Sequence, residues 1–237
     1  MQVRRLTTVP KSTMLLLAVG FCAQLSWHFL VPLAPPRAED LPPAPSIATL
    51  RLTSLGDPVS YAKILLLYLQ TFDNQPGVSA PFRRLDYPRL ASWLNVTLQL
   101  DPPSQYPLFL ASQVYGDVGD PAKKRLMFNF VYEQFFIDPN RRWRSLAYAA
   151  TMTRHQLNDF GRAEQYAEAL RLYATENNVP SWARQMDIFM LEDMGLYQRA
   201  LDLTDELLKS GQVTDAFELR FLQDRRDKIS AKAKALQ

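Results

Sequence analysis

The side chains best suited to chemistry in this sequence are few and far apart. His155 is the only histidine beyond residue 28. A catalytic histidine works with a nucleophile and an orienting group, and no serine, cysteine or second histidine is paired with it locally. Carboxylates occur at Glu192, Asp193 and Glu218, but at no spacing typical of a glycosidase or a metal site. We therefore predict no catalytic residue, no metal site, no cofactor and no enzymatic activity.

Composition excludes further classes of site. Cys22 is the single cysteine, so neither a disulfide nor a thiolate metal cluster can form within one chain. The chain has 8 glycines, and neither the G-x-G-x-x-G nor the G-x-x-x-x-G-K pattern of phosphate-binding loops occurs.

The net charge of +3 is concentrated at the N-terminal end. Of 27 Lys and Arg residues against 24 Asp and Glu, Arg4, Arg5 and Lys11 lie in residues 1–34, which hold no acidic residue. The remainder is therefore electroneutral. Because nucleic-acid binding needs a basic face, we predict no nucleic-acid partner.

Residues 1–13 are polar and basic, and residues 14–33 form an uncharged apolar run. Twenty helical residues rise about 30 Å, which matches the hydrocarbon core of a bilayer. We predict a single transmembrane anchor at 14–33. The alternatives are a cleaved signal peptide, for which Ala23 and Ala34 offer poor cleavage sites, and an organelle-targeting peptide. The positive-inside rule predicts a cytoplasmic N-terminus and a C-terminal domain outside the cytoplasm, periplasmic if the membrane is a bacterial inner membrane.

Residues 34–56 follow as a proline-rich segment. Seven of the 17 prolines lie within 32–58. Such a run favours polyproline conformations, so we predict a semi-rigid linker, with plain disorder as the alternative.

The rest of the chain shows helical periodicity and almost no strand alternation, which predicts an all-α domain over 57–222. Helices are expected at 58–72, 121–137, 162–174 and 197–208, with a loop over 74–86. Asp57 and Asp120 each precede a proline, which is typical of a helix start. Asp215 and Glu218 predict a capping box that opens a last helix. The charged residues 223–237 are expected to be a solvated helix or a frayed tail.

Similar helix ends recur along the chain. Pro102, Pro139 and Pro180 each close a helix and are 37 and 41 residues apart, and Ala163 and Ala200 are 37 apart. This pattern resembles the tetratricopeptide repeat, although the period is longer and less even than the family's. The resemblance implies an α-solenoid of helical hairpins with a concave groove. Another α-solenoid and a compact bundle are the alternatives.

The resemblance also implies a ligand-binding face, because the first helix of each pair lines the groove in that family. Arg144, Tyr148, Thr151 and His155 stand at steps of 4, 3 and 4, so they share one helix face. We predict this face to be the groove surface, and a solvated face is the alternative.

A second candidate is a basic patch for an acidic peptide. Its five members stand at two expected helix starts: Lys123, Lys124, Arg125, Arg141 and Arg142. Solvated charges and salt bridges between repeats are the alternatives.

Together these features predict a membrane-anchored scaffold that binds a protein partner, as a peptide or helix in the groove, and supports assembly or biogenesis of an envelope or membrane complex. The alternatives are an enzyme or small-ligand domain acting on envelope polymers, and a permanent structural subunit of a membrane complex.

Overall fold

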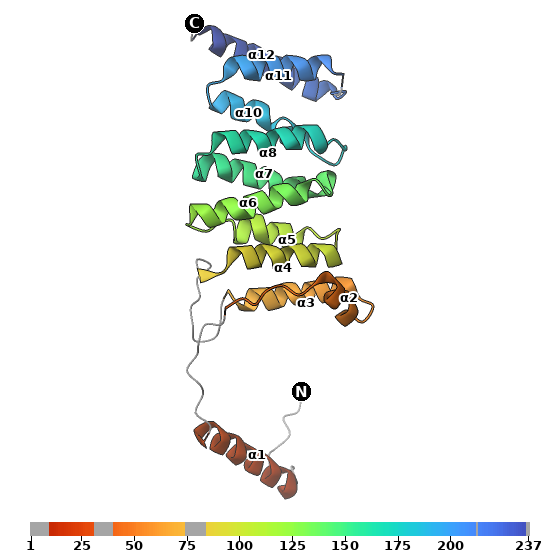
Figure 1. The fold of residues 1–237 in the computed structure, drawn as a ribbon, viewed down its shortest axis with the longest axis vertical. Helices are drawn as coiled ribbons and strands as arrows, with labels where there is room; N and C mark the ends of the chain where they lie inside the picture. Colours follow the sequence, from red (N-terminus) through yellow and green to blue (C-terminus); the bar gives the residue numbers. More distant parts are fainter. Residues whose placement is uncertain (1–9, 31–39, 74–83, 212, 236–237) are drawn as a thin grey trace. The chain divides into compact units, whose positions relative to one another are not determined.

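The computed structural model describes residues 10–30, 40–73, 84–211 and 213–235, and in these residues the regular structure is helical, without strands (Figure 1). The chain divides into two units, residues 1–37 with 76–78, and residues 38–75 with 79–237.

The described part of the first unit is helix α1 (Lys11–Leu30), which begins three residues before the predicted anchor. It has 20 residues, a mean hydropathy of 1.5 and no buried residue. Its length and composition suffice to cross a membrane. Residues 31–33 of the predicted anchor lie outside the described residues.

The second unit is built from helices in chain order. Its elements are α2 (Ile47–Thr53), α3 (Pro58–Thr71), α4 (Tyr87–Leu100), α5 (Tyr106–Phe109), the π-helix η3 (Leu110–Val114), α6 (Pro121–Phe135), α7 (Pro139–Gln156), α8 (Phe160–Tyr173), α9 (Ser181–Arg184), α10 (Met186–Asp193), α11 (Tyr197–Lys209) and α12 (Ala216–Ala235).

Helices that are close in sequence pack against one another in this unit. Figure 1 shows α6 beside α7, α7 beside α8, α8 beside α10 and α11 beside α12, and their residues are in contact. The apolar stripe expected in 162–174 is buried in α8 at Ala163, Tyr166, Ala167 and Leu170. Burial of these stripes supplies the main folding force.

Buried apolar side chains gather in two clusters. The larger includes residues from Leu41 to Met190. The smaller joins α10, α11 and α12 through Ile188, Leu191, Ala200, Leu222 and Ile229.

The predicted helix starts at Asp57 and Asp120 are confirmed. The Asp57 carboxylate accepts a hydrogen bond from Ser60 N, and the Asp120 carboxylate accepts one from Ala122 N at 2.9 Å. Asp215 likewise accepts bonds from the backbone N–H groups of Phe217 and Glu218. The Glu218 carboxylate does not close a capping box, because it binds Ser181 Oγ and Gln185 Nε2 instead.

The expected linker differs from the structure over residues 40–56. Residues 47–53 form α2, capped by Ser46, and Leu41 and Leu50 are buried. Arg89 Nη1 donates to the Leu41 carbonyl and Trp93 Nε1 donates to the Pro42 carbonyl, both at 2.8 Å. These residues therefore belong to the helical unit, and residues 34–39 lie outside the described residues.

The charged C-terminal segment also departs from a frayed tail. Residues 223–235 continue α12, and Ile229 is fully buried. Arg225 pairs with Glu192 of α10, and Arg226 pairs with Asp205 of α11. The segment is thus fixed to its neighbours by one apolar contact and two ion pairs.

The π-helix η3 builds a buried polar cluster beside α3 and α4. Tyr115 N donates to the Leu110 carbonyl at 2.8 Å. Tyr115 Oη donates to Asp73 Oδ2 at 2.9 Å, and Tyr87 Oη donates to the Tyr115 carbonyl at 3.0 Å. Burial raises the pKa of Asp73 to about 6, opposed by the Tyr115 hydrogen bond.

Candidate functional site

The most clearly bounded hollow with charged walls lies between α8, α10 and α11, and we call it the α8–α11 cleft. It encloses about 330 Å³. It is lined by Glu164, Glu168 and Arg171 of α8, Asp187 and Leu191 of α10, and Arg199, Asp202, Leu203 and Glu206 of α11. The hollow continues past Arg171, Leu203 and Glu206 toward Thr175 and Ser210.

Helical spacing explains why these side chains meet. Glu164, Glu168 and Arg171 follow at i, i+4 and i+7, so they share one face of α8. Arg199, Asp202 and Glu206 follow at i, i+3 and i+7 on α11. The opposite faces of both helices are apolar and buried, at Ala163 and Leu170 in α8 and at Ala200 in α11. Burial of the apolar stripes thus turns the charged faces toward each other.

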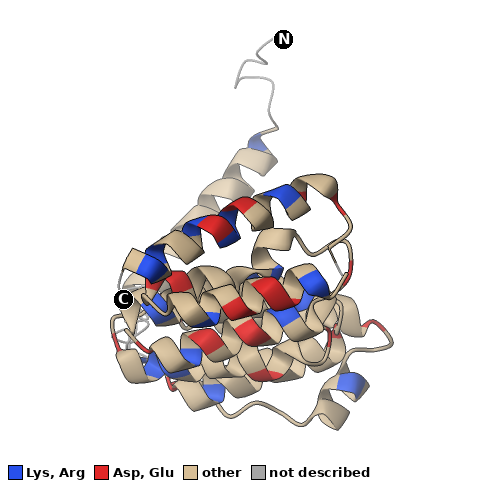
Figure 2. Cartoon of the chain, turned by 90° about the horizontal axis from the view of Figure 1, so that it is seen from above, with Lys and Arg blue, Asp and Glu red and all other residues tan. Residues whose placement is uncertain are grey.

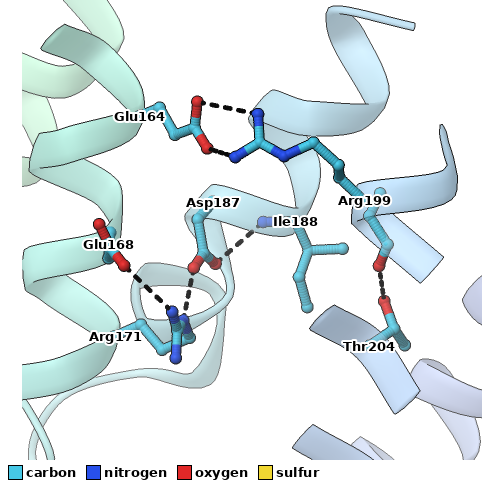
Figure 3. Close-up of polar contacts among 8 residues, drawn as sticks. Glu164, Glu168, Arg171, Asp187, Ile188, Arg199 and Thr204 are labelled. Carbon is cyan, nitrogen blue, oxygen red and sulfur yellow. Dashed lines mark hydrogen bonds and ion pairs between the residues drawn. The ribbon is translucent and has the colours of Figure 1, made fainter. Parts of the chain in front are cut away.

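Asp187 forms the charged floor of the cleft. The residue is only 2% exposed. Its Oδ2 accepts a hydrogen bond from Arg171 Nε at 2.6 Å, and its Oδ1 accepts one from Ile188 N at 2.9 Å (Figure 3). Burial raises the pKa of Asp187, while the hydrogen bond and charge of Arg171 oppose that rise. This pair ties α10 to α8.

A second ion pair bridges the two walls. Glu164 of α8 and Arg199 of α11 are joined by both oxygens and both terminal nitrogens (Figure 3). Arg171 also lies 3.8 Å from Glu168. Both arginines of the cleft are therefore already paired with carboxylates.

The cleft carries an excess of negative charge. Its lining holds five carboxylates against two guanidinium groups. Asp202 and Glu206 are exposed and lie one turn apart on α11. Asp202 accepts a hydrogen bond from the neutral Gln198 side chain at 3.0 Å. This pattern of charge complements a cationic ligand.

No protein-family model, curated protein or solved structure matches this chain. The resemblance to tetratricopeptide repeats therefore depends on the residue pattern of the chain itself.

In the described part of the chain, no group of three or more His, Cys, Asp or Glu side chains is placed to hold a metal ion. The α8–α11 cleft holds its carboxylates in pairs with arginine or along one open helix face. This arrangement suits binding of a charged segment, since ion pairs and hydrogen bonds are what its side chains offer.

The predicted groove face lies on α7, and the cleft described above is lined by other residues. Arg144 is exposed and its guanidinium lies 4.6 Å from the Trp143 ring centre. Thr151 Oγ1 donates to the Ala147 carbonyl at 3.0 Å. Tyr148 is half-buried, and burial raises its pKa. His155 is exposed near the end of α7. The face remains a predicted binding surface.

The structure does not bring the five predicted basic residues together. Lys124 Nζ binds Gln156 at the last residue of α7, whereas Arg142 at the start of α7 binds Gln134 near the end of α6. The two helices are therefore antiparallel, and the two groups of basic residues stand at opposite ends, about 15–20 Å apart. Figure 2 shows both signs of charge interspersed along the helices.

Individual contacts explain most of these basic residues. Arg125 lies 3.8 Å from Asp159, and Arg141 lies 3.1 Å from Asp138. Lys123 Nζ donates to the Leu85 carbonyl and lies 5.0 Å from the Tyr87 ring centre. Lys124 and Arg142 are buried. The last two are structural and cannot form part of an open patch.

Sequence reasoning missed the α8–α11 cleft because its side chains come from three helices. One signal was present. Glu164 and Arg199 are 35 residues apart, close to the spacing of 37 between Ala163 and Ala200. Opposite charges separated by one repeat are typical of side chains that pair across neighbouring repeats.

Proposed function

We propose that this chain is a membrane-anchored helical-repeat scaffold. It holds a partner protein on the non-cytoplasmic side of the inner (plasma) membrane, and it supports assembly or biogenesis of a membrane or envelope complex.

Support for the anchor comes from α1. The helix is long and apolar enough to cross a bilayer, and it packs no side chain against the helical unit. Arg4, Arg5 and Lys11 precede or begin it. Under the positive-inside rule these residues keep the N-terminus in the cytoplasm and direct residues 40–237 to the other side.

Support for the repeat comes from long-range hydrogen bonds with similar separations in sequence. The bond from Gln70 to Tyr106 spans 36 residues, Gln134 to Asn95 spans 39, and Tyr166 to Asn129 spans 37. Ser181 to Glu218 again spans 37. Such contacts are expected when each helical pair packs on an equivalent pair one repeat away.

The observation that carries the partner-binding proposal is the α8–α11 cleft. It combines a hollow of about 330 Å³, apolar side chains at Leu191 and Leu203, and carboxylates in excess. A peptide segment with lysine or arginine side chains between apolar ones fits this combination. The charges select and orient such a segment, and the apolar contacts contribute affinity.

A crosslinking experiment in native membranes tests the proposal. Leu203 is replaced by a photoreactive benzoylphenylalanine, and crosslinked partners are identified by mass spectrometry. We expect one dominant partner, and we expect Asp202→Lys to reduce its yield strongly. Asp224→Lys, at an exposed position of α12, is the matched control and should leave the yield unchanged.

Three results are informative in different ways. Equal yields from Asp202→Lys and Asp224→Lys would argue against the cleft. Photoreactive substitution of His155 provides a second probe, and a partner captured there alone would place binding on the α7 face. Recovery of uncrosslinked protein from both positions would contradict the scaffold proposal.

A further inference from the structure

The helices nearest the anchor in sequence expose large apolar side chains. Leu52 of α2 is 80% exposed and Leu55, just after α2, is 93% exposed. On α3 the exposed apolar residues are Val59, Ile64, Leu67 and Tyr68. We call these six residues the α2–α3 apolar surface.

The inner sides of the same helices already supply the core contacts. Leu50 of α2 and Leu65, Leu66 and Leu69 of α3 are buried, and both helices pack against α4. The α2–α3 apolar surface is therefore a separate, outward set of side chains. Contiguous exposed apolar surface of this kind usually marks an interaction with another protein or with a membrane.

The backbone at Leu55 adds an independent observation. Leu55 has a φ of 51° and Gly56 a φ of 91°. A left-handed conformation is unfavourable for leucine, and asparagine or glycine adopts it more readily. An apolar side chain thus stands at the end of the turn at a conformational cost, which a surrounding apolar medium would offset.

The charges of α2 and α3 fit a phospholipid surface. Arg51 and Lys63 are the charged residues of these two helices, and neither helix contains an acidic residue. Asp57 lies between them, with its carboxylate bound to Ser60 N. Leucine side chains flanked by arginine and lysine are typical of surfaces that rest at the boundary between headgroups and acyl chains.

The length of the connection keeps this surface close to the anchor. Arg89 and Trp93 of α4 bind the carbonyls of Leu41 and Pro42, so Leu41 is fixed to the helix that also holds α2 and α3. From Leu30, the end of α1, to Leu41 a fully extended chain reaches at most about 40 Å. A bilayer surface within that distance is available to α2 and α3 whenever α1 spans the membrane.

We propose that the α2–α3 apolar surface rests on the lipid bilayer, with Leu52 and Leu55 inserted at the level where headgroups meet acyl chains. The inference depends on the proposed anchoring by α1 and goes beyond it. It assigns a second membrane contact, which fixes how the helical unit is oriented on the membrane.

Depth-dependent fluorescence quenching tests this inference on the full chain. In a Cys22→Ala background, a bimane label is attached at Leu55→Cys or, in a second variant, at Leu52→Cys. The control is Phe217→Cys in α12, which is 81% exposed. Each protein is reconstituted into vesicles of phosphatidylcholine and phosphatidylglycerol with and without lipids that carry a doxyl group near the headgroup.

We expect a blue-shifted emission and a loss of intensity with doxyl lipid at positions 52 and 55, and neither change at 217. Unquenched labels at 52 and 55 in protein that floats with the vesicles would overturn the inference and leave the anchor intact. A shift that depends on the protein-to-lipid ratio, without lipid quenching, would show that a second copy covers the surface and would also overturn it. Failure to float would overturn both the anchor and the inference.

Discussion

Arg142 shows that a basic residue at the start of a helix can be part of the core. Its Nη1 donates to the Gln134 carbonyl at 2.7 Å and its Nη2 donates to the Pro102 carbonyl at 3.1 Å. The guanidinium therefore satisfies carbonyls at the end of α6 and after α4. Burial lowers the pKa of Arg142, but an arginine side chain remains protonated.

Replacing Arg142 by methionine should destabilise the helical unit. The variant keeps most of the volume and leaves two carbonyls without donors, so we expect the free energy of unfolding to fall by about 2–4 kcal/mol. Urea unfolding of the full chain in detergent, followed by circular dichroism, measures this change. Arg141→Met is the control, because exposed ion pairs contribute at most about 1 kcal/mol. Equal effects of the two variants would contradict a structural role for Arg142.

Asp73 gives a prediction for pH. Tyr115 donates to Asp73 Oδ2, while Asp73 Oδ1 is buried without a hydrogen-bond partner. Burial raises the pKa of Asp73 from 3.8 to about 6. A raised pKa means that the folded state favours the protonated form. Its contribution to stability is fully present below pH 3.8 and is lost as the pH rises through 6.

Asp73→Asn should remove this dependence. At pH 7.5 we expect the variant to be more stable than the original chain by about 1–2 kcal/mol, because a neutral amide replaces a partly desolvated carboxylate. The difference should vanish near pH 4. Thermal unfolding at a series of pH values measures both limits, and parallel pH profiles for the two proteins would contradict the assignment.

At the scale of elements, the turn after η3 depends on a close approach at Gly116. A Cβ atom at this position would lie 2.7 Å from Phe128 Cε1 and 2.9 Å from the Ala111 carbonyl oxygen, and closer still to the Ser112 carbonyl oxygen. Two of these neighbours are backbone atoms of the π-helix, which cannot move without breaking its hydrogen bonds. The bond from Tyr115 N to the Leu110 carbonyl is one of them.

Gly116→Ala should therefore destabilise the protein by about 1–3 kcal/mol through overpacking. Gly119→Ala is a matched control, because nothing lies within 4 Å of a Cβ at Gly119. The midpoint of urea unfolding measures both. A midpoint for Gly116→Ala as high as that for Gly119→Ala would show that the turn relaxes.

The sequence predicted the helices whose apolar period is regular and missed those stabilised by distant contacts. The helices expected at 58–72, 121–137 and 162–174 correspond to α3, α6 and α8, with boundaries that differ by one or two residues. Proline content obscured α2, because the bonds from Arg89 and Trp93 that hold its flank lie 48 and 51 residues away.

The candidate site was less accessible to prediction for the same reason. Charge content marked residues 223–237 as solvated, since nothing local shows that Arg225 reaches Glu192 or that Arg226 reaches Asp205. The helical spacing of Arg144 and His155 defined a face but not its neighbours. The α8–α11 cleft requires the order in which the helices pack, and a single helical period does not contain that information.

At the scale of the whole molecule, the two apolar clusters predict two levels of stability in the helical unit. The cluster of Ile188, Leu191, Ala200, Leu222 and Ile229 is the smaller one, and it closes the C-terminal end. We expect amide hydrogens in α11 and α12 to exchange faster than those in α6, α7 and α8, because less apolar surface must be exposed to open them.

Hydrogen exchange followed by mass spectrometry checks this expectation. Ile229→Ala should accelerate exchange in α11 and α12 and leave α6 and α7 unchanged. Phe217→Ala removes a side chain that is 81% exposed and should change neither. Uniform acceleration along all helices in Ile229→Ala would show that the unit unfolds as one.

Helix α10 belongs to both clusters, with Met186 and Met190 in one and Ile188 and Leu191 in the other. Its Asp187 also holds Arg171 of α8, and Glu164 with Arg199 joins α8 to α11 across the same cleft (Figure 3). In mechanical terms, a pull on the C-terminus reaches this joint before it reaches the larger cluster. A segment bound between α8 and α11 acts as a brace across the joint, so the tension needed to peel away α11 and α12 rises when the cleft is filled.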